Sequence, residues 1–205
     1  MSSADAEPAP GTPEAQWAEL IAAIDGSQDP HGLRELGHSL LQFWELDDRW
    51  RSQLRDQARR DPKVATALQS ASLLNERIVA DIIGWDHIAL TWCRYYEQHN
   101  PWDQWAEQTL IPLFINRQSL PTDEAWHVVL QLLQAAPDDK VLGNIGASPI
   151  EDLLSSDPEN VARLIESEAD NNPRLRRALA HVWQQTIPTE TFDRVKRLAD
   201  LPNGQ

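Results

Sequence analysis

The sequence predicts an all-α protein, an antiparallel helical bundle that grades into short stacked helix pairs towards the C-terminus. Apolar residues recur at spacings of three and four along most of the chain, whereas Val and Ile do not form the alternating runs of β-strands. At six positions beyond the N-terminal tail a helix-capping residue stands directly before a proline, the order that fixes where a helix begins. The six pairs are Asp29-Pro30, Asp61-Pro62, Asn100-Pro101, Ser148-Pro149, Asp157-Pro158 and Asn172-Pro173.

The longer helices are expected in the N-terminal part of the chain. Residues 1–14, rich in Ala, Pro, Ser and Glu, should form a disordered tail, and a short helix is predicted over 14–24. A long helix is predicted over 30–54, where Asp47 is the one polar residue of an otherwise apolar stripe. Residues 15–118 are therefore expected to form a long-helix region.

Single residues set the other boundaries that are expected in this region. Asp61 should cap a helix that runs to Ile82, and Gly84 ends that helix or marks a close crossing. Pro112 should kink or end the helix that starts at Asn100-Pro101, because an internal proline removes a backbone hydrogen bond.

Residues 119–205 are expected to carry shorter helices and to form one compact unit with the preceding region. Short connections between successive helices imply antiparallel neighbours. Caps in this short-helix region are expected at Thr122, Asp138, Ser148, Asp157, Asn172 and Thr189.

The most distinctive local signal is the segment 147–154, which reads Ala-Ser-Pro-Ile-Glu-Asp-Leu-Leu. Ser148 can cap a helix, Pro149 fits its first turn, and Glu151 can reach back to the cap. This pattern is a capping box with proline at the first helical position. Glu151 and Asp152 complement the helix dipole, or they meet a basic partner if the turn leaves them in a concave place.

The net charge of −14 is spread evenly, since residues 1–120 hold 18 acidic and 10 basic residues and residues 121–205 hold 14 and 8. An acidic surface repels nucleic-acid phosphates and favours a basic partner, although acidity also simply keeps a protein soluble. No apolar run approaches the roughly 20 residues of a membrane span. The N-terminus does not resemble a secretory signal, and the single Cys93 cannot form an internal disulfide. A cytoplasmic protein is expected, without nucleic-acid or membrane partners.

Candidate chemistry is sparse. Two Glu-x-x-His pairs, Glu35/His38 and Glu124/His127, have the spacing that di-metal helical bundles use, but acids near helix starts and chance explain them as well. The sequence contains no zinc motif, no Cys pair, no nucleophile elbow and no phosphate loop, so no metal, cofactor or catalytic residue is predicted. The stretch Gly143-Asn144-Ile145-Gly146 is interpreted as structural, ending one helix and allowing a close approach.

Nine tryptophans are unusual for this length, and core packing is the default role for most of them. Trp102 and Trp105, beside Asp103 and Glu107, are the candidates for partly exposed anchors, because tryptophan with a polar rim is typical of interface hot spots. Together with Glu151 and Asp152, these two tryptophans are the predicted partner-binding residues.

Residues from about 120 to 185 resemble an uncharacterised bacterial domain family with an Ala-Gly-Pro-Leu-Glu-Asp-Leu-Leu segment. Ala147, Pro149 and the run Glu151 to Leu154 match this segment, while Ser148 replaces glycine and Ile150 replaces leucine. The resemblance continues to a closing pair at Val182-Trp183. It implies an all-helical domain and no established activity.

A non-enzymatic protein-interaction module is the function that these features favour, and an immunity- or antitoxin-type inhibitor of a basic partner is its most specific version. An adaptor or assembly subunit of a larger complex is the first alternative. The second is a metal-dependent enzyme that uses the two Glu-x-x-His pairs.

Overall fold

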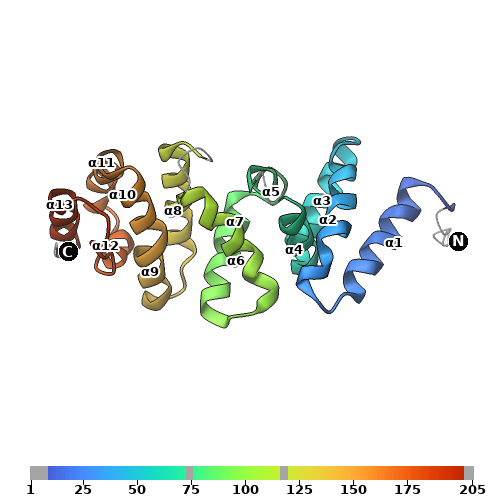
Figure 1. The fold of residues 1–205 in the computed structure, drawn as a ribbon, viewed down its shortest axis with the longest axis horizontal. Coiled ribbons are helices and arrows are strands. Elements are labelled where there is room, and N and C mark those ends of the chain that lie inside the picture. The colour runs from blue at the N-terminus through green and yellow to red at the C-terminus, as the bar shows by residue number, and fades with distance from the viewer. Residues whose placement is uncertain (1–8, 73–75, 116–119, 201–205) are drawn as a thin grey trace, which may run out of the picture. The chain divides into compact units, whose positions relative to one another are not determined.

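A computed structural model describes residues 9–72, 76–115 and 120–200, and every regular element within these ranges is a helix (Figure 1). The all-α prediction is confirmed. Contacts divide the chain into two units, Met1–Ile83 and Gly84–Gln205. The boundary that the sequence suggested, at 118/119, lies inside the second unit. Within the described ranges no helix combines the length and apolarity needed to cross a bilayer.

The first unit is built around one buried helix. Its elements are α1 (Pro13–Gly26), the 3-10 turn η1 (Pro30–Leu33), α2 (Arg34–Trp44), α3 (Asp48–Arg60), α4 (Pro62–Ala71) and α5 (Glu76–Ile83). Helix α4 packs against the other four α-helices and η1, and residues 64–69 are all buried. Gly37 of α2 permits the closest crossing, because a Cβ there would lie 2.0 Å from the Ala67 carbonyl oxygen.

The long helix predicted over 30–54 is wrong. The chain turns between α2 and α3, and Asp47, with φ −157°, is the N-cap of α3. Its carboxylate accepts a hydrogen bond from the Trp50 backbone N–H at 3.1 Å, so this polar residue begins a helix instead of interrupting one. The turn brings Trp50 against Trp17 and Phe43, with ring centroids 4.9–5.6 Å apart. The helix predicted over 62–82 is likewise two helices, α4 and α5.

The second unit consists of helices that pack both on their neighbours in sequence and on helices further along the chain. They are α6 (Trp85–Gln98), η2 (Pro101–Asp103), α7 (Gln104–Ile115), α8 (Thr122–Ala135), α9 (Asp139–Ile145), the π-helical turn η3 (Gly146–Ile150), α10 (Glu151–Ser156), α11 (Pro158–Ala169), α12 (Pro173–Leu179) and α13 (Thr189–Ala199). Helix α6 packs on α7 and α8, α9 packs on α12, and α13 packs on both α11 and α12. Figure 1 shows α8 to α13 lying side by side.

Four of the predicted side-chain caps form. The side chains of Asp61, Asn100, Asp138 and Asn172 each accept a hydrogen bond from a backbone N–H two or three residues ahead. Those at Thr122 and Thr189 are wrong, because Pro121 and Pro188 occupy the N-cap positions. Asp157 is an N-cap without a side-chain cap bond.

Three further expectations concern the N-terminal tail, Gly84 and Pro112. Residues 1–8 of the predicted tail lie outside the described residues, and α1 already begins at Pro13. Gly84, with φ +92°, separates α5 from α6 as expected. Pro112 lies inside α7, which continues to Ile115.

The C-terminal ends of the helices are bound by basic side chains from other parts of the chain. Within the second unit, Arg174 Nε donates to the Leu133 carbonyl at 2.6 Å, near the end of α8, and Lys196 Nζ donates to the Ala180 carbonyl at 2.8 Å, just after α12. Cations suit these positions because the last carbonyls of a helix lack partners and carry partial negative charge. The six described side chains that act in this way are Arg51, Arg55, Lys63, Arg174, Arg176 and Lys196.

Candidate functional site

The distinctive segment 147–154 lies in a continuous helical path, so the predicted capping box at Ser148 is wrong. Helix α9 passes through η3 directly into α10, and Pro149 sits inside the π-helical turn. Proline has no N–H to donate, and its ring clashes with the carbonyl four residues before it in an α-helix. A wider π turn relieves this clash without ending the helix.

The π turn packs tightly against the end of α12. A Cβ on Gly146 would lie 2.0 Å from the carbonyl oxygen of Ala178, and one on Gly143 would lie 3.2 Å from the His181 ring. The close approach expected of these glycines is therefore present, and Gly146 is the C-cap of α9, where the chain passes directly into η3. This contact brings the end of α12 against η3 and α9.

Glu151 is a buried structural residue and does not face solvent. Its side chain is 5% exposed, and its Oε2 accepts a hydrogen bond from the Trp183 backbone N–H at 2.9 Å. The carboxylate thus serves the turn 32 residues away and does not reach back to Ser148. The Glu151 carboxylate is therefore already used inside the fold, and its role in partner binding stays a prediction.

Asp152 remains partly open to solvent. Ser148 Oγ donates to its Oδ2 at 3.4 Å. Burial raises the pKa of Asp152, the Ser148 hydrogen bond lowers it, and the neighbouring Glu151 raises it further. The net result is a pKa above that of an ordinary aspartate.

Trp183 is the most exposed large hydrophobic side chain of the described residues, at 69%. In the sequence, Trp183 belongs to the pair Val182-Trp183 at which the family resemblance ends. A signal that could have distinguished it is the polar run Gln184-Gln185-Thr186 that follows, since a turn between helices leaves its side chains outside. The Glu151 carboxylate, on α10, accepts the hydrogen bond from the backbone N–H of this exposed tryptophan.

The second predicted site lies at the corner formed by α6, η2 and α7. Trp105 is 2% exposed, so the expectation that it is a partly exposed anchor is wrong, whereas Trp102 is half-buried. Asp103 is 1% exposed and binds Arg94 through two hydrogen bonds of 2.6 and 2.7 Å. This pair locks η2 onto α6 and raises the pKa of Arg94.

Beside that pair lies an aromatic cluster that sequence reasoning did not single out. Tyr96 packs on Trp92 with ring centroids 4.2 Å apart, and Tyr95 meets Tyr96 edge-on at 5.5 Å. The Tyr96 hydroxyl donates to Glu107 of α7. Burial and the Glu107 carboxylate raise the pKa of both Tyr95 and Tyr96.

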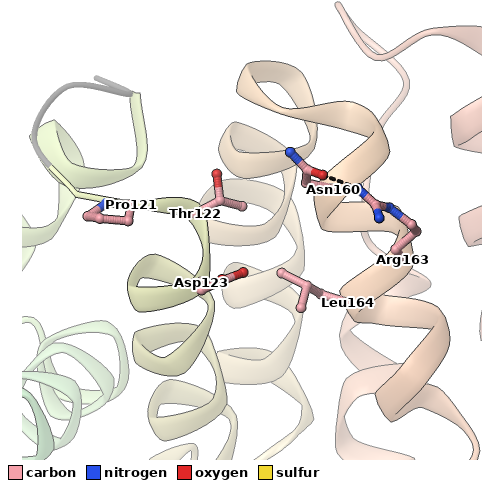
Figure 2. Close-up of a pocket in the computed structure, with 6 residues that line it drawn as sticks. All are labelled: Pro121, Thr122, Asp123, Asn160, Arg163 and Leu164. Carbon is pink, nitrogen blue, oxygen red and sulfur yellow. Dashed lines mark hydrogen bonds between the residues drawn. The ribbon is translucent and has the colours of Figure 1, made fainter.

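A polar pocket of about 430 Å³ lies between the start of α8 and the first half of α11 (Figure 2). Its polar groups already bind one another or their surroundings. Thr122 and Asn160 both donate to Asp157 at 2.8 Å, and Arg163 donates to Asn160, the contact dashed in Figure 2. The lining residues are Pro121, Thr122, Asp123, Asn160, Arg163 and Leu164. These residue types suit a small polar molecule and supply no activated nucleophile.

The two Glu-x-x-His pairs belong to different units. Glu35 and His38 lie on α2, where His38 lines an apolar pocket of about 270 Å³ with Trp44 and Ile78. On α8, the His127 ring nitrogen Nδ1 lies 2.7 Å from the Asp123 carbonyl oxygen. Over the described part of the chain, no group of three or more His, Cys, Asp or Glu side chains is placed to hold a metal ion.

Comparison with known proteins bears on the second unit. The model of a family of unknown function (DUF6869) matches residues 94–202, more than half of the chain. The chain belongs to this family. The expected resemblance to an uncharacterised domain is therefore confirmed, over a longer stretch than 120–185. The matched region contains the π turn, Glu107, Glu151 and Trp183. No curated protein and no solved structure matches the chain.

Proposed function

We propose that this protein is a non-enzymatic interaction module that binds a basic protein partner and uses Trp183 as its apolar anchor. The observation that carries the proposal is the 69% exposure of Trp183 on a turn whose backbone is bound by the buried carboxylate of Glu151. An immunity- or antitoxin-type inhibitor is the most specific form of this function.

The way in which Trp183 is held supports a binding role. Tryptophan is among the residues that dominate interface energies, and its large ring loses little entropy when it is bound. A backbone that is fixed before binding reduces the entropy cost further. Glu151 and the tight contact of Gly146 with α12 provide this fixation.

The distribution of charge supports a basic partner. The chain holds 32 acidic and 18 basic residues, which gives a net charge of −14, and the acidic excess occurs in both halves of the sequence. The field of this charge speeds the approach of a basic protein and weakens with added salt.

Affinity capture with three versions of the chain tests the proposal. The wild type and Leu46→Ala, which also shortens an exposed apolar side chain, are expected to retain the same basic protein at low salt. Trp183→Ala is expected to lose it while keeping the wild-type helical content and thermal midpoint. Retention of that protein by Trp183→Ala, or equal loss from Leu46→Ala, would contradict the proposal.

An assembly subunit is the second candidate. Ile111 and Ile115 lie one turn apart on α7 and are both exposed, a pattern that suits contact with another protein chain. This function predicts a native mass above 23.2 kDa that falls in an Ile111→Glu/Ile115→Glu double variant. A monomeric wild type would count against self-assembly.

A further inference from the structure

The corner of α6, η2 and α7 carries a cluster of partly exposed aromatic and acidic side chains. Tyr95, Tyr96 and Glu107 are each half-buried, so their side chains are held by packing and still meet solvent. The two tyrosines stand edge to face, and the hydroxyl of Tyr96 binds the Glu107 carboxylate. The half-buried Trp102 of η2 belongs to the same corner.

Glu107 is an acidic group of this corner that forms no ion pair with another described residue. Asp103 is fully occupied by the two hydrogen bonds to Arg94, so those two charges cancel. None of the ion pairs formed by described residues includes Glu107, whose partner is the Tyr96 hydroxyl. The negative charge of Glu107 also reaches the Tyr95 phenol, where it raises the pKa.

We propose that Glu107, Tyr95 and Tyr96 form a recognition site for an arginine side chain of the basic partner, an inference that rests on the proposed interaction function. A guanidinium group is planar, so it can pair with a carboxylate and stack on an aromatic ring at the same time. It is also less strongly hydrated than the ammonium group of lysine. A partly buried carboxylate beside two partly exposed phenol groups offers these two kinds of contact together.

The site can be read directly, because Tyr95 and Tyr96 are the only two tyrosines of the chain. In full-length protein with isotope-labelled tyrosine, every tyrosine ring signal in the NMR spectrum comes from this corner. The probe is an amidated peptide of alternating arginine and glycine. The control peptide contains citrulline, which keeps the planar shape of arginine and lacks its charge.

The arginine peptide is expected to shift the ring signals of both tyrosines in a saturable way, and the citrulline peptide is not. Glu107→Gln should weaken the binding of the arginine peptide by about 5-fold, the upper range for a partly exposed ion pair. Glu190→Gln, which removes an exposed carboxylate from α13, should leave it within about 2-fold of the wild type.

Two results would overturn the inference. One is an equal response to the arginine and citrulline peptides. The other is equal weakening by Glu107→Gln and Glu190→Gln, which would indicate attraction to the overall charge alone. The helical content of each variant shows that it is folded.

The peptide assay needs neither Trp183 nor the natural partner, and Trp183→Ala should leave the tyrosine shifts unchanged. Capture that depends on Trp183, without peptide binding at the tyrosines, would therefore overturn the arginine site alone. The reverse result would overturn the proposed role of Trp183 and leave the arginine site supported.

Discussion

At the scale of single residues, one buried carboxylate determines how the largest exposed aromatic side chain is held. Glu151 lies at the start of α10, and its bond to the Trp183 N–H joins positions 32 residues apart. A hydrogen bond to a charged group contributes more than a neutral one, and a buried N–H left without an acceptor costs further free energy. Glu151 is therefore a stability residue whose loss also releases the turn that carries Trp183.

Glu151→Ala is expected to lower the free energy of unfolding by about 1.5–3 kcal/mol, because the Trp183 N–H loses its acceptor. Glu151→Gln keeps an acceptor oxygen and should lose less. Urea titration followed by circular dichroism measures both values. Glu190→Ala is the control, since an exposed surface substitution usually stays within about 0.5 kcal/mol; equal losses for Glu151→Ala and Glu190→Ala would contradict the structural role.

Asp152→Asn is expected to leave the protein at least as stable as the wild type at neutral pH. Burial raises the pKa of Asp152 in the folded state above the ordinary 3.8, so its ionisation costs stability as the pH rises through that folded value. The neutral amide avoids this cost, and the difference between variant and wild type should vanish below about pH 3.8. Thermal midpoints measured across this pH range test the sign; a variant less stable than wild type at pH 7 but equal to it in acid would contradict it.

At the scale of elements, the path from α9 through η3 to α10 shows how a proline can remain within a helix. Pro149 requires extra room at its N-terminal side, and the π turn provides this room without a break. Gly146 then lets the widened turn approach the backbone of α12. A π turn is less stable than a regular α-helical turn, and here it sets the positions of α9 and α10 on either side of it.

Gly146→Ala is expected to destabilise the protein by about 1–3 kcal/mol, because its Cβ would meet the Ala178 carbonyl oxygen at 2.0 Å and the crossing would have to open. Gly26→Ala is the matched control, since a Cβ at Gly26 has no heavy atom within 4 Å. That substitution should be neutral or slightly stabilising. Chemical denaturation of both variants tests the prediction, which equal effects would contradict.

At the scale of the whole molecule, basic side chains bind the ends of helices that belong to other elements. Helices α1, α2, α5, α8 and α11 have no basic residue in their own last turns. Their terminal carbonyls are bound by arginine or lysine from other elements of the same unit. Positive charge therefore stabilises helix ends within each unit, while carboxylates dominate the exposed surface.

Arg174→Met is expected to destabilise the protein by about 1–2 kcal/mol, since the carbonyls of Leu133 and Ala136 lose a charged donor. Arg197→Met removes the same charge from an exposed position on α13 and should change stability by less than about 0.5 kcal/mol. Thermal unfolding of the two variants separates the capping role from net charge. Equal midpoints would contradict the capping role.

Local signals predicted well those features that depend on a few adjacent residues. The caps at Asp61 and Asp138 formed as expected, because an N-cap needs only a backbone N–H two or three positions ahead. Ser148 carries the same signal, and no helix begins there. The α9–η3–α10 path is held by contacts with α12, and such contacts override a local preference.

The candidate site was less predictable for the same reason. Trp102, Trp105, Glu151 and Asp152 were chosen by residue type and spacing, and the structure buries Trp105 and Glu151. Trp183 is bound by Glu151, and Glu107 is bound by Tyr96. Each partner lies on another helix, so sequence spacing cannot identify these contacts. A period of three and four residues indicates which side of a helix is apolar, but not which helix covers it.

By itself, the sequence determined an all-helical chain, most of its helix starts, its acidity and its membership of the family. These properties depend on composition, periodicity and hydrogen bonds between near neighbours. Only the tertiary structure decided that Asp47 starts a helix and that Glu151 is buried under the turn at Trp183. It also decided which basic side chains donate hydrogen bonds to the carbonyls at helix ends. Each of these depends on which distant groups meet once the helices pack, because burial and the satisfaction of backbone groups are decided in space.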